Sequence, residues 1–502
     1  MKPQWKRWSQ LPEADVQRQQ EQRLGQYLRN VVLPFSAHYR RMFHEQGLTA
    51  DSIKTLDDLA RLPFTSKSDL INTPDNPQRS RDFLIVPDQK ILSHRPGIML
   101  QAVLQGRASV REKLEAEYRP VFMTFTTGRS AKPVPFLYSR HDLDRLAIAG
   151  RRVMEVCGAR PEDKLLNSFP YAPHLAFWLT HYAGTAFGAM MFSTGGGKVT
   201  NTNDTLRLIR KLKPDVFIGM PTFLYHVLHL AAEEGLRWEN LRCLVLGGEK
   251  VSDGLRQKLR DLAHELGVPQ HKLEVLATYG FTEAKMAWPE CPAPHGEPSG
   301  GYHLYPDMGI TEIINPKTGE VLPPSHPGEI VFTPLDARGT VVLRYRTGDF
   351  TDGGITMEPC PYCHRRMPRL IGHISRSSEI REMALDKIKG TLVDFNELEH
   401  VLDEAPNVGA WQVELRKAHD DPLELDEIVL HVQKTNGVDE NQLSRELSER
   451  CYQYTDIHPN RIFFHDAEEM QRLQGVGTLL KEQKLVDHRP KIATEERSTA
   501  SP

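Results

Sequence analysis

Between residues 204 and 279, the pattern of apolar and polar positions changes repeatedly between helical spacing and the short continuous runs of buried strands. The predicted elements, in chain order, are the helix Thr205–Lys211, the strand Asp215–Met220, the helix Thr222–Glu234, the strand Arg242–Leu246 and the strand Leu273–Thr278. Strands that alternate with helices form βαβ units, so the pattern predicts an α/β fold with a parallel sheet. Ligands of such sheets bind beyond the carboxyl ends of the strands.

A further helix is predicted between the last two of these strands. Ser252 is a candidate N-cap, because its hydroxyl can accept a hydrogen bond from the first free backbone N–H groups. Leucines at positions 255, 259, 262 and 266 recur at helical spacing, and Gly267 stands where a C-cap glycine is expected. The helix is therefore predicted to begin after Ser252 and to end before Gly267.

After Gly309 the chain changes to short β-like runs with turn residues, which predicts a small β-subdomain. The runs are Ile310–Ile314, Pro316–Gly319, Glu329–Phe332 and Thr340–Tyr345. A separate α+β segment begins near Ile371, with helices near Phe395–Leu402 and Asn441–Tyr452 and strands near Gly409–Leu415 and Glu427–Gln433. We therefore expect an N-terminal domain over 1–375, a C-terminal domain over 376–490 beyond a hinge at 376–381, and a disordered tail over 491–502.

Composition narrows the class of partner. A formal charge of only −3 over 502 residues gives no field to attract nucleic acid or an anionic membrane. The polar start of the chain, Met1 to Leu24, does not resemble a signal peptide, so a cytoplasmic location is expected. The apolar run Leu175–Phe192 is long enough to suggest a membrane span, but prolines, glycines and histidines in and beside it favour a buried helix instead.

Several polar motifs follow or flank the predicted strands. The segment Thr126–Pro133 combines hydroxyls, a glycine and a lysine, which suits a phosphate-binding loop but also an ordinary turn. Gly247-Gly248-Glu249 and Tyr279-Gly280 lie at carboxyl ends of strands, where a ligand is expected. Further along are Tyr279–Glu283, Arg344–Asp349 and Lys481. Together these motifs predict a site for a nucleotide.

The order and spacing of these motifs resemble the adenylate-forming superfamily of acyl-CoA synthetases, in particular its phenylacetate-CoA ligase branch. The segments Ile53–Leu59 and Leu62–Leu70 are similar to an N-terminal signature of that branch. The resemblance covers nearly the whole chain. It implies a large α/β domain, a small mobile C-terminal domain, and a reaction in which a carboxylate attacks ATP to give acyl-AMP, from which coenzyme A then displaces AMP.

The resemblance also implies a role for individual residues. The phosphate loop comprises Thr126, Thr127, Gly128, Arg129, Ser130 and Lys132, and the adenine site Gly248, Glu249, Thr278, Tyr279 and Gly280. Asp349 is expected to accept both ribose hydroxyls, and Arg376 to reach ribose or phosphate. The catalytic group comprises Lys481, which stabilises charge on the α-phosphate, Thr282, which contacts that phosphate, and Glu283, which holds Mg²⁺.

Departures from the family pattern keep other functions open. Arg129 and Ala131 replace residues usual in the loop, and Ser378-Glu379 replaces a pair of aspartates after the hinge. An adenylating amide synthetase or carrier-protein loader shares every ATP motif and differs only in its acceptor. A catalytically inactive nucleotide-binding zinc protein is a third possibility. Retention of Lys481, Glu283 and Asp349 argues against the inactive protein.

A second cluster predicts a structural zinc ion. Cys360-Pro361-Tyr362-Cys363 presents two thiols at the spacing of a tetrahedral site, and an upstream cysteine, Cys291, with a histidine would complete it. Both His295 and His303 are within reach in the sequence. The phrase Gly301-Tyr302-His303 resembles the ligand phrase of zinc-bearing relatives, which favours His303 in the predicted subdomain at about 285–370. Unmetallated thiols are the alternative.

Candidates for the acyl pocket are Tyr171, His174, Phe177 and Pro221, with Tyr279 beside them. Aromatic side chains suit a flat aryl or arylacetic acid, although the same side chains are common in a protein core. The expected partners are therefore a small carboxylic acid, ATP with Mg²⁺, and coenzyme A, without nucleic acid or membrane. A homodimer is left open.

Overall fold

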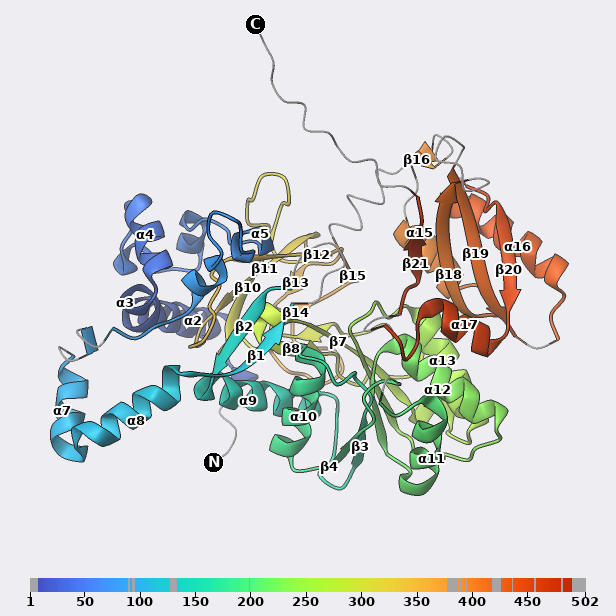
Figure 1. Cartoon of the computed structure of the whole chain (residues 1–502), viewed down its shortest axis with the longest axis horizontal. Helices are drawn as coiled ribbons and strands as arrows, with labels where there is room; N and C mark the ends of the chain where they lie inside the picture. Colours follow the sequence, from blue (N-terminus) through green and yellow to red (C-terminus); the bar gives the residue numbers. More distant parts are fainter. Residues whose placement is uncertain are drawn as a thin grey trace, which may run out of the picture. The chain divides into compact units, whose positions relative to one another are not determined.

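The computed structural model describes residues 8–88, 91–92, 95–126, 133–197, 199–376, 387–388, 391–392, 395–417, 426–435, 437–455, 457–479 and 482–489 (Figure 1). The chain divides into two compact units. The first comprises Met1–Val251 and Leu259–Ser377, and the second comprises Ser252–Lys258 and Ser378–Pro502. Each unit has its own core and is described by itself.

The largest sheet of the first unit has six strands in the order β4-β3-β5-β6-β7-β8. They are β3 (Lys164–Asn167), β4 (Met190–Ser193), β5 (Val216–Gly219), β6 (Cys243–Gly247), β7 (Glu274–Phe281) and β8 (Met286–Pro289). Only β8 is antiparallel to its neighbour, so the predicted parallel sheet and α/β class are confirmed. The strands β5 and β6 are buried along their whole length, as their continuous apolar runs require.

The helices that precede or connect these strands are α9 (Arg140–Val156), α10 (Leu175–Phe187), α11 (Thr202–Leu212), α12 (Pro221–Glu233) and α13 (Asp253–Glu265). The bounds of α11, α12 and α13 are close to the predicted ones, whereas α9 was not predicted. The backbone N–H of Leu255 donates to Ser252 Oγ at 3.2 Å, so Ser252 caps α13 as predicted. Gly267 has a φ of +94°, a left-handed conformation that favours glycine at a helix end.

The apolar run Leu175–Phe192 is not one helix, and this part of the prediction is wrong. The helix α10 ends at Phe187, Gly188 takes a left-handed conformation with φ +86°, and the chain enters β4. The glycine ends the helix because only a residue without a side chain adopts that conformation cheaply. Within the described part of the chain, no helix has the length and apolar character needed to cross a membrane.

An N-terminal layer of helices and a two-stranded sheet share a second core, which includes the buried Tyr39 and Phe136. The elements are α2 (Glu13–Tyr27), η1 (Leu28–Val32), α3 (Leu33–Phe35), α4 (Ala37–Glu45), η2 (Ala50–Ser52), η3 (Asp57–Arg61), α5 (Lys67–Leu70), η4 (Arg79–Phe83), α7 (Pro96–Gln105), α8 (Arg107–Tyr118), β1 (Pro120–Phe125) and β2 (Pro135–Ser139). The strand β2 leads directly into α9, whose first turn is capped by Ser139.

The predicted β-subdomain consists of two small sheets, with strand orders β10-β11-β12-β15 and β13-β14-β9. Their bounds are β9 (Tyr302–His303), β10 (Gly309–Ile314), β11 (Gly328–Pro334), β12 (Tyr345–Thr351), β13 (Ile355–Thr356), β14 (Arg369–Leu370) and β15 (Ile374–Arg376). The short η5 (Gln270–Lys272) and η6 (Thr282–Ala284) flank β7. Every pairing in these two sheets is antiparallel, and the pairs β10 with β11, β11 with β12 and β13 with β14 join strands that are consecutive along the chain.

Two of the predicted runs in this subdomain are not strands. Pro316–Gly319 is a turn, in which Gly319 N donates to Asn315 O at 2.8 Å. The chain from Thr340 to Arg344 bonds to distant segments instead of a neighbouring strand: Val341 N donates to Phe83 O at 2.9 Å and Leu343 N to Tyr39 Oη at 2.8 Å. Its apolar side chains fill the N-terminal core, which explains why they resembled a strand.

The second unit contains a four-stranded sheet in the order β20-β19-β18-β21. Its elements are β16 (Lys387–Ile388), β17 (Thr391–Leu392), α15 (Phe395–Asp403), β18 (Val408–Lys417), β19 (Asp426–Lys434), α16 (Glu440–Thr455), β20 (Arg461–His465), α17 (Ala467–Gln474) and β21 (Leu485–Asp487). The four elements predicted here are present. β20 and α17 were not predicted. Apolar side chains of the helices and the sheet form the core of this unit.

Candidate active site and metal centre

The carboxyl ends of β6 and β7 meet at one edge of the large sheet. Thr278 Oγ1 donates to Leu246 O at 2.8 Å, and Gly247 is the register partner of Thr278. A Cβ on Gly247 would stand 2.5 Å from Thr278 Oγ1, so a side chain does not fit there. Gly248 follows with a φ of +87°. The glycine pair is therefore required by close strand packing and by the turn out of the sheet.

Glu249 bridges this edge to the start of α12. Its Oε2 accepts from the backbone N of Thr222 at 3.1 Å and from Thr222 Oγ1 at 2.8 Å. Its Oε1 is buried and has no hydrogen-bond partner among the described residues. A buried carboxylate oxygen without a partner is costly, so this atom is available to a donor supplied by a ligand.

Tyr279 connects the large sheet to the β-subdomain. Its hydroxyl donates to Asp349 Oδ2 at 2.8 Å, and Asp349 is only 8% exposed. The Tyr279 ring is stacked against Trp288 with centroids 5.9 Å apart. Asp349 is the register partner of Arg376 in the pairing of β12 with β15, so the backbone brings these two predicted ribose residues together.

Glu283 lies in η6, directly after β7, and is buried. Tyr345 Oη donates to Glu283 Oε1 at 2.5 Å. Burial raises the pKa of Glu283, the hydrogen bond from Tyr345 lowers it, and the nearby charge of Asp349 raises it, so that the net pKa is above its ordinary value. Tyr345 was not predicted as a site residue, although it belongs to the Arg344–Asp349 motif.

The end of β1 approaches the same region. Thr282 Oγ1 donates to Phe125 O at 3.4 Å, and His174 Nδ1 lies 3.1 Å from the same carbonyl. Thr126 follows and is 4% exposed, with its Oγ1 accepting from Val134 N at 3.1 Å. Residues 126 and 134 therefore form the base of the predicted phosphate loop, and Phe125, which directly precedes this base, contacts Thr282.

Part of the predicted site lies outside the described residues. This part comprises Thr127, Gly128, Arg129, Ser130 and Lys132 of the loop, the catalytic candidate Lys481, and the side chain of Arg376. Their roles stay predictions. The described residues that do come together at the sheet edge belong to five separate chain segments: Thr126, Gly248 with Glu249, Thr278 to Gly280 with Thr282 and Glu283, Asp349, and the backbone of Arg376.

An open groove of about 660 Å³ lies between β1 and α10. Two acyl-pocket candidates, Tyr171 and Phe177, line it, and the other three, His174, Pro221 and Tyr279, do not. The remaining lining residues are Phe122, Met123, Ala172, Pro173, Trp178 and His181. The Phe177 and Trp178 rings meet edge to face, with centroids 5.1 Å apart. The groove is thus mainly aromatic and apolar.

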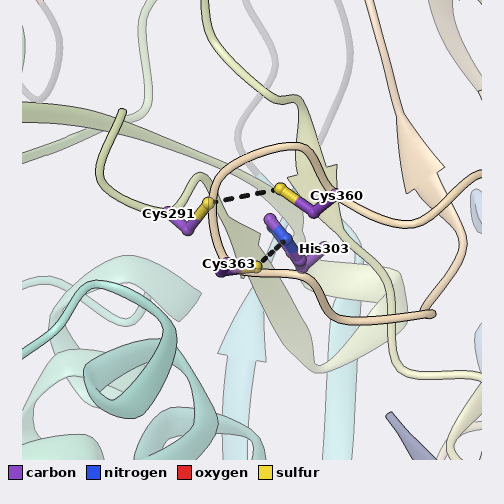
Figure 2. A group of neighbouring side chains, drawn as sticks. All are labelled: Cys291, His303, Cys360 and Cys363. Carbon is purple, nitrogen blue, oxygen red and sulfur yellow. Dashed lines mark hydrogen bonds between the residues drawn. The ribbon is translucent and has the colours of Figure 1, made fainter. Parts of the chain in front are cut away.

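The predicted zinc residues Cys291, His303, Cys360 and Cys363 form one cluster (Figure 2). One ligand atom from each lies within 4.8 Å of all the others. Cys291 Sγ is 3.6 Å from Cys360 Sγ, and His303 Nε2 is 3.1 Å from Cys363 Sγ. Cys291, His303 and Cys360 are buried. His295 is exposed and does not belong to the group.

The local fold explains why these four side chains converge. Cys291 follows β8, His303 ends β9, and both later cysteines lie in the turn between β13 and β14. His303 Nδ1 lies 3.3 Å from Pro289 O, which leaves Nε2 directed at the sulfurs. Hydrogen bonding with Cys291 lowers the pKa of Cys363 far below its ordinary value, which favours a thiolate in the cluster. Three sulfurs and one imidazole match the ligand set of structural zinc sites.

Residues 40–334 match the model of the AMP-binding enzyme family. This match covers more than half of the chain, and the chain belongs to that family. Phenylacetate-coenzyme A ligase of Pseudomonas putida is 28% identical over 316 residues, which are 62% of this chain and 61% of that protein. The enzyme of the same name from Thermus thermophilus is 27% identical over 366 residues, 72% of this chain and 71% of that protein. The chain thus spans about three fifths of the length of the first of these relatives.

A solved structure shows the same fold over nearly the whole chain. It is the crystal structure of 2-hydroxyisobutyryl-CoA ligase in the postadenylation state in complex with R3-HIB-AMP. The TM-score is 0.71 at 19% sequence identity, with 95% of this chain and 91% of that chain covered. The predicted family and fold class are therefore confirmed.

Proposed function

We propose that this protein is an AMP-forming acid–thiol ligase, which activates a carboxylic acid with ATP to an acyl-adenylate and transfers the acyl group to coenzyme A. Membership of the AMP-binding family and similarity to phenylacetate-coenzyme A ligases support this function. The observation that carries it is the convergence of three carboxylates, each in a different predicted nucleotide contact: Glu283 and Asp349 are buried, and Glu249 is half-buried with its Oε1 atom buried.

The chemistry of these carboxylates fits a magnesium nucleotide. Glu249 has a buried oxygen without a partner among the described residues, and this oxygen would accept a hydrogen bond from the amino group of adenine. Asp349 is the acceptor for the ribose hydroxyls, because a carboxylate can take two such bonds at once. Glu283 is the Mg²⁺ ligand, since Mg²⁺ prefers carboxylate oxygens and phosphates. When bound, the cation would neutralise charge between the substrate carboxylate and the triphosphate.

The remaining parts of the mechanism rest on the family resemblance. The loop 127–132 holds the β- and γ-phosphates, and Lys481 stabilises the charge that develops on the α-phosphate and the attacking carboxylate. Rotation of the C-terminal domain between the two half-reactions removes Lys481 after adenylation. Thr282, which the structure joins to the base of the loop through Phe125 O, positions the α-phosphate.

The aromatic groove supports a hydrophobic acid as substrate. Its lining by Phe122, Tyr171, Phe177 and Trp178 would cover a flat ring, and the absence of a described lysine or arginine from the lining disfavours acids with a second negative charge. We propose an aryl or arylacetic acid.

We also propose that the cysteine–histidine cluster holds a structural Zn²⁺ ion. Four protein donors fill a tetrahedral shell and leave no position for a substrate. The ion would join the turn between β13 and β14 to β8 and β9, and so stabilise the β-subdomain that carries Asp349.

The function is tested by carboxylate-dependent exchange of labelled pyrophosphate into ATP, measured over a panel of aryl, arylacetic and aliphatic acids. Exchange that requires a hydrophobic acid is expected, because acyl-AMP formation is reversible. Addition of coenzyme A should then produce a thioester and AMP. If no acid supports exchange, the proposed enzymatic activity is refuted. Exchange without thioester would indicate the amide synthetase or carrier-protein loader instead. The variant Asp349→Ala, which removes the ribose contact, is the matched inactive control.

A further inference from the structure

Lys285 is a buried lysine that lies two residues after Glu283, the proposed Mg²⁺ ligand. Its side chain is only 7% exposed, and lysines are rarely buried unless they are paired. The Nζ atom donates to Leu137 O at 2.9 Å and to Asp142 Oδ2 at 3.0 Å. It also lies 4.7 Å from the centroid of the Tyr138 ring. The proposed reaction gives this ammonium group no role so far.

The backbone of Lys285 ends the turn that carries two of the predicted catalytic residues. Lys285 has a φ of +57°, and its N–H donates to Thr282 O at 3.1 Å, which closes η6 after Glu283. A left-handed conformation is unfavourable for a residue with a side chain, and it persists only where the surrounding contacts impose it. The two hydrogen bonds of Nζ are such contacts. The position of η6 therefore depends on where the ammonium group is held.

Asp142 is the charged acceptor that holds the ammonium group. It lies in the first turn of α9 and is buried, and Ser139 N donates to its Oδ2 at 3.0 Å. Gly339 N donates to the same oxygen at 2.7 Å, and Arg338 N donates to Oδ1 at 2.9 Å. Burial raises the pKa of Asp142, but the charge of Lys285 and these hydrogen bonds lower it by more. The net pKa is below its ordinary value, so the carboxylate is ionised at neutral pH.

This carboxylate joins three segments that lead to predicted nucleotide contacts. Lys285 ends the turn of the proposed Mg²⁺ ligand and leads into β8, and β8, β2 and α9 lie together in Figure 1. The strand β2 pairs with β1, and at the end of β1 Phe125 O accepts from Thr282 Oγ1 at 3.4 Å. The segment after Gly339 leads into β12, which carries Asp349. The ion pair thus connects η6 to the strands that lead to the phosphate loop and to the ribose acceptor.

We propose that Lys285 is a positioning residue for adenylation: its ammonium group, held by Asp142 and Leu137 O, fixes η6 so that Glu283 can bind the Mg²⁺ ion of the nucleotide. This inference rests on the proposed function, because it takes Glu283 as the Mg²⁺ ligand. Tyr345 contacts the Glu283 carboxylate itself, whereas Lys285 holds the backbone that carries it. Groups that orient a metal ligand in this way affect metal affinity although they do not touch the metal.

The test compares ATP binding by the full-length protein with Mg²⁺ and with EDTA, measured by isothermal titration calorimetry. Lys285→Met removes the charge and keeps an unbranched side chain. It should weaken binding of ATP with Mg²⁺ by about 10- to 100-fold. Binding of ATP in EDTA should change far less, because most of the proposed nucleotide contacts lie outside η6. Unchanged binding with Mg²⁺, or an equal loss with and without Mg²⁺, would overturn the proposal.

Two further variants separate positioning from general stability. Arg152→Met breaks the buried pair of Arg152 with Asp307, which makes none of the proposed nucleotide contacts. It should lower the thermal midpoint as Lys285→Met does, but leave Mg²⁺-dependent ATP binding unchanged. Lys285→Met combined with Asp142→Asn leaves no unpaired buried charge, so it should regain stability relative to Lys285→Met alone. It should not regain the Mg²⁺-dependent affinity, because η6 still lacks its anchor. Recovery of both properties would refute the positioning role.

Pyrophosphate exchange distinguishes failure of this inference from failure of the proposed function. Wild-type protein that binds ATP more tightly with Mg²⁺, loses this gain in Lys285→Met, and supports exchange with no acid would reject the ligase activity but keep Lys285 as the anchor of a magnesium–nucleotide site. Wild-type protein that catalyses exchange while Lys285→Met retains the full effect of Mg²⁺ would keep the ligase and reject the inference.

Discussion

The cysteine–histidine cluster and the predicted nucleotide site differ in how far their polar groups find partners within the folded chain. The cysteine–histidine cluster draws its four donors from neighbouring strands and turns between residues 291 and 363, and all of its ligand atoms lie within 4.8 Å of one another. The predicted nucleotide site at the edge of the large sheet is formed by residues between 126 and 376. It contains a buried carboxylate oxygen of Glu249 without a described partner. A structural site satisfies its own polar groups, whereas a substrate site keeps some of them for the substrate.

The largest effect is expected at the nucleotide site. Lys481→Ala should reduce acid-dependent pyrophosphate exchange by about 10³-fold, because it removes a charge that stabilises the transition state. Thioester formation from supplied acyl-AMP and coenzyme A should be largely preserved, since the proposed mechanism uses Lys481 only for adenylation. Rapid-quench measurement of the two half-reactions separates these effects. An equal loss in both half-reactions would contradict the assignment of Lys481 to adenylation.

At the cluster, loss of one ligand should affect stability more than chemistry. Cys363→Ser is expected to lower zinc content from one equivalent and to destabilise the protein by roughly 3 kcal/mol, because metal binding contributes to folding. Elemental analysis of freshly purified protein and thermal unfolding measure the two changes. Cys157→Ala is the control, since Cys157 is buried but lies outside the cluster. Wild-type protein that contains no stoichiometric zinc would exclude the metal.

A buried ion pair between Arg152 and Asp307 allows a test of the pH dependence of stability in the first unit. Arg152 Nη1 and Nη2 donate to Asp307 at 2.6 and 2.7 Å. Burial raises the pKa of Asp307, but the hydrogen bonds and the charge of Arg152 lower it by more. The net pKa is therefore below its ordinary value. A carboxyl with a lowered folded pKa stabilises the protein above its unfolded pKa of about 3.9 and loses this contribution as pH falls through the folded value.

Asp307→Asn should therefore lower the thermal midpoint at pH 7, by an amount that corresponds to about 2 kcal/mol. The difference from the wild type should shrink as the pH is lowered below about 4. Differential scanning calorimetry from acid to neutral pH measures it. The exposed pair Arg237 with Glu239 is the control: Glu239→Gln should change the midpoint little at any pH. A constant difference between Asp307→Asn and the wild type across pH would contradict the assignment.

The smallest kinetic effects are expected for Tyr345 and Tyr279, the two tyrosines of the predicted nucleotide site, and they should differ from each other. Tyr345→Phe removes the hydrogen bond to Glu283 and should lower the exchange rate by about tenfold, because Glu283, the proposed Mg²⁺ ligand, would be held less firmly. A higher Mg²⁺ requirement should accompany the loss. Tyr279→Phe removes the hydrogen bond to Asp349, so it should mainly raise the KM for ATP. If both variants changed the same kinetic constant to the same extent, the assignment of different roles to Glu283 and Asp349 would be wrong.

The fold of the chain was predicted most accurately where local pattern and tertiary environment agree. The helices and strands between residues 202 and 281 have long apolar runs or clear caps, and their bounds differ from the predictions by only a few residues. The segment Thr340–Tyr345 was misassigned because its apolar side chains fill a core shared with α4 and η4, while its backbone bonds to those distant segments. The sequence indicated that this segment is buried, but it did not indicate which segments its backbone would hydrogen-bond to.

The candidate site shows the same division. Cys360 and Cys363 were identified from their spacing, because thiols at that spacing are typical of a metal site, whereas Glu283 was identified from the family resemblance. Tyr345 was missed because its role depends on the 2.5 Å contact of its hydroxyl with Glu283, and these residues are far apart in the chain. The Glu249 oxygen that has no partner within the described part of the chain could not be predicted either, since its state depends on which atoms surround it.

The sequence by itself determined the α/β class, the family and the inventory of candidate ligands, because periodicity, caps and motif spacing are local properties of the chain. Only the tertiary structure decided that His303 rather than His295 joins the three cysteines, and that Tyr279 and Asp349 meet across two sheets. It also decided that Met99, Leu100, Val103 and Leu104 of α7 are exposed. The physical reason is that hydrogen bonds, metal geometry and burial depend on distances between residues far apart in sequence, which only the packed chain fixes.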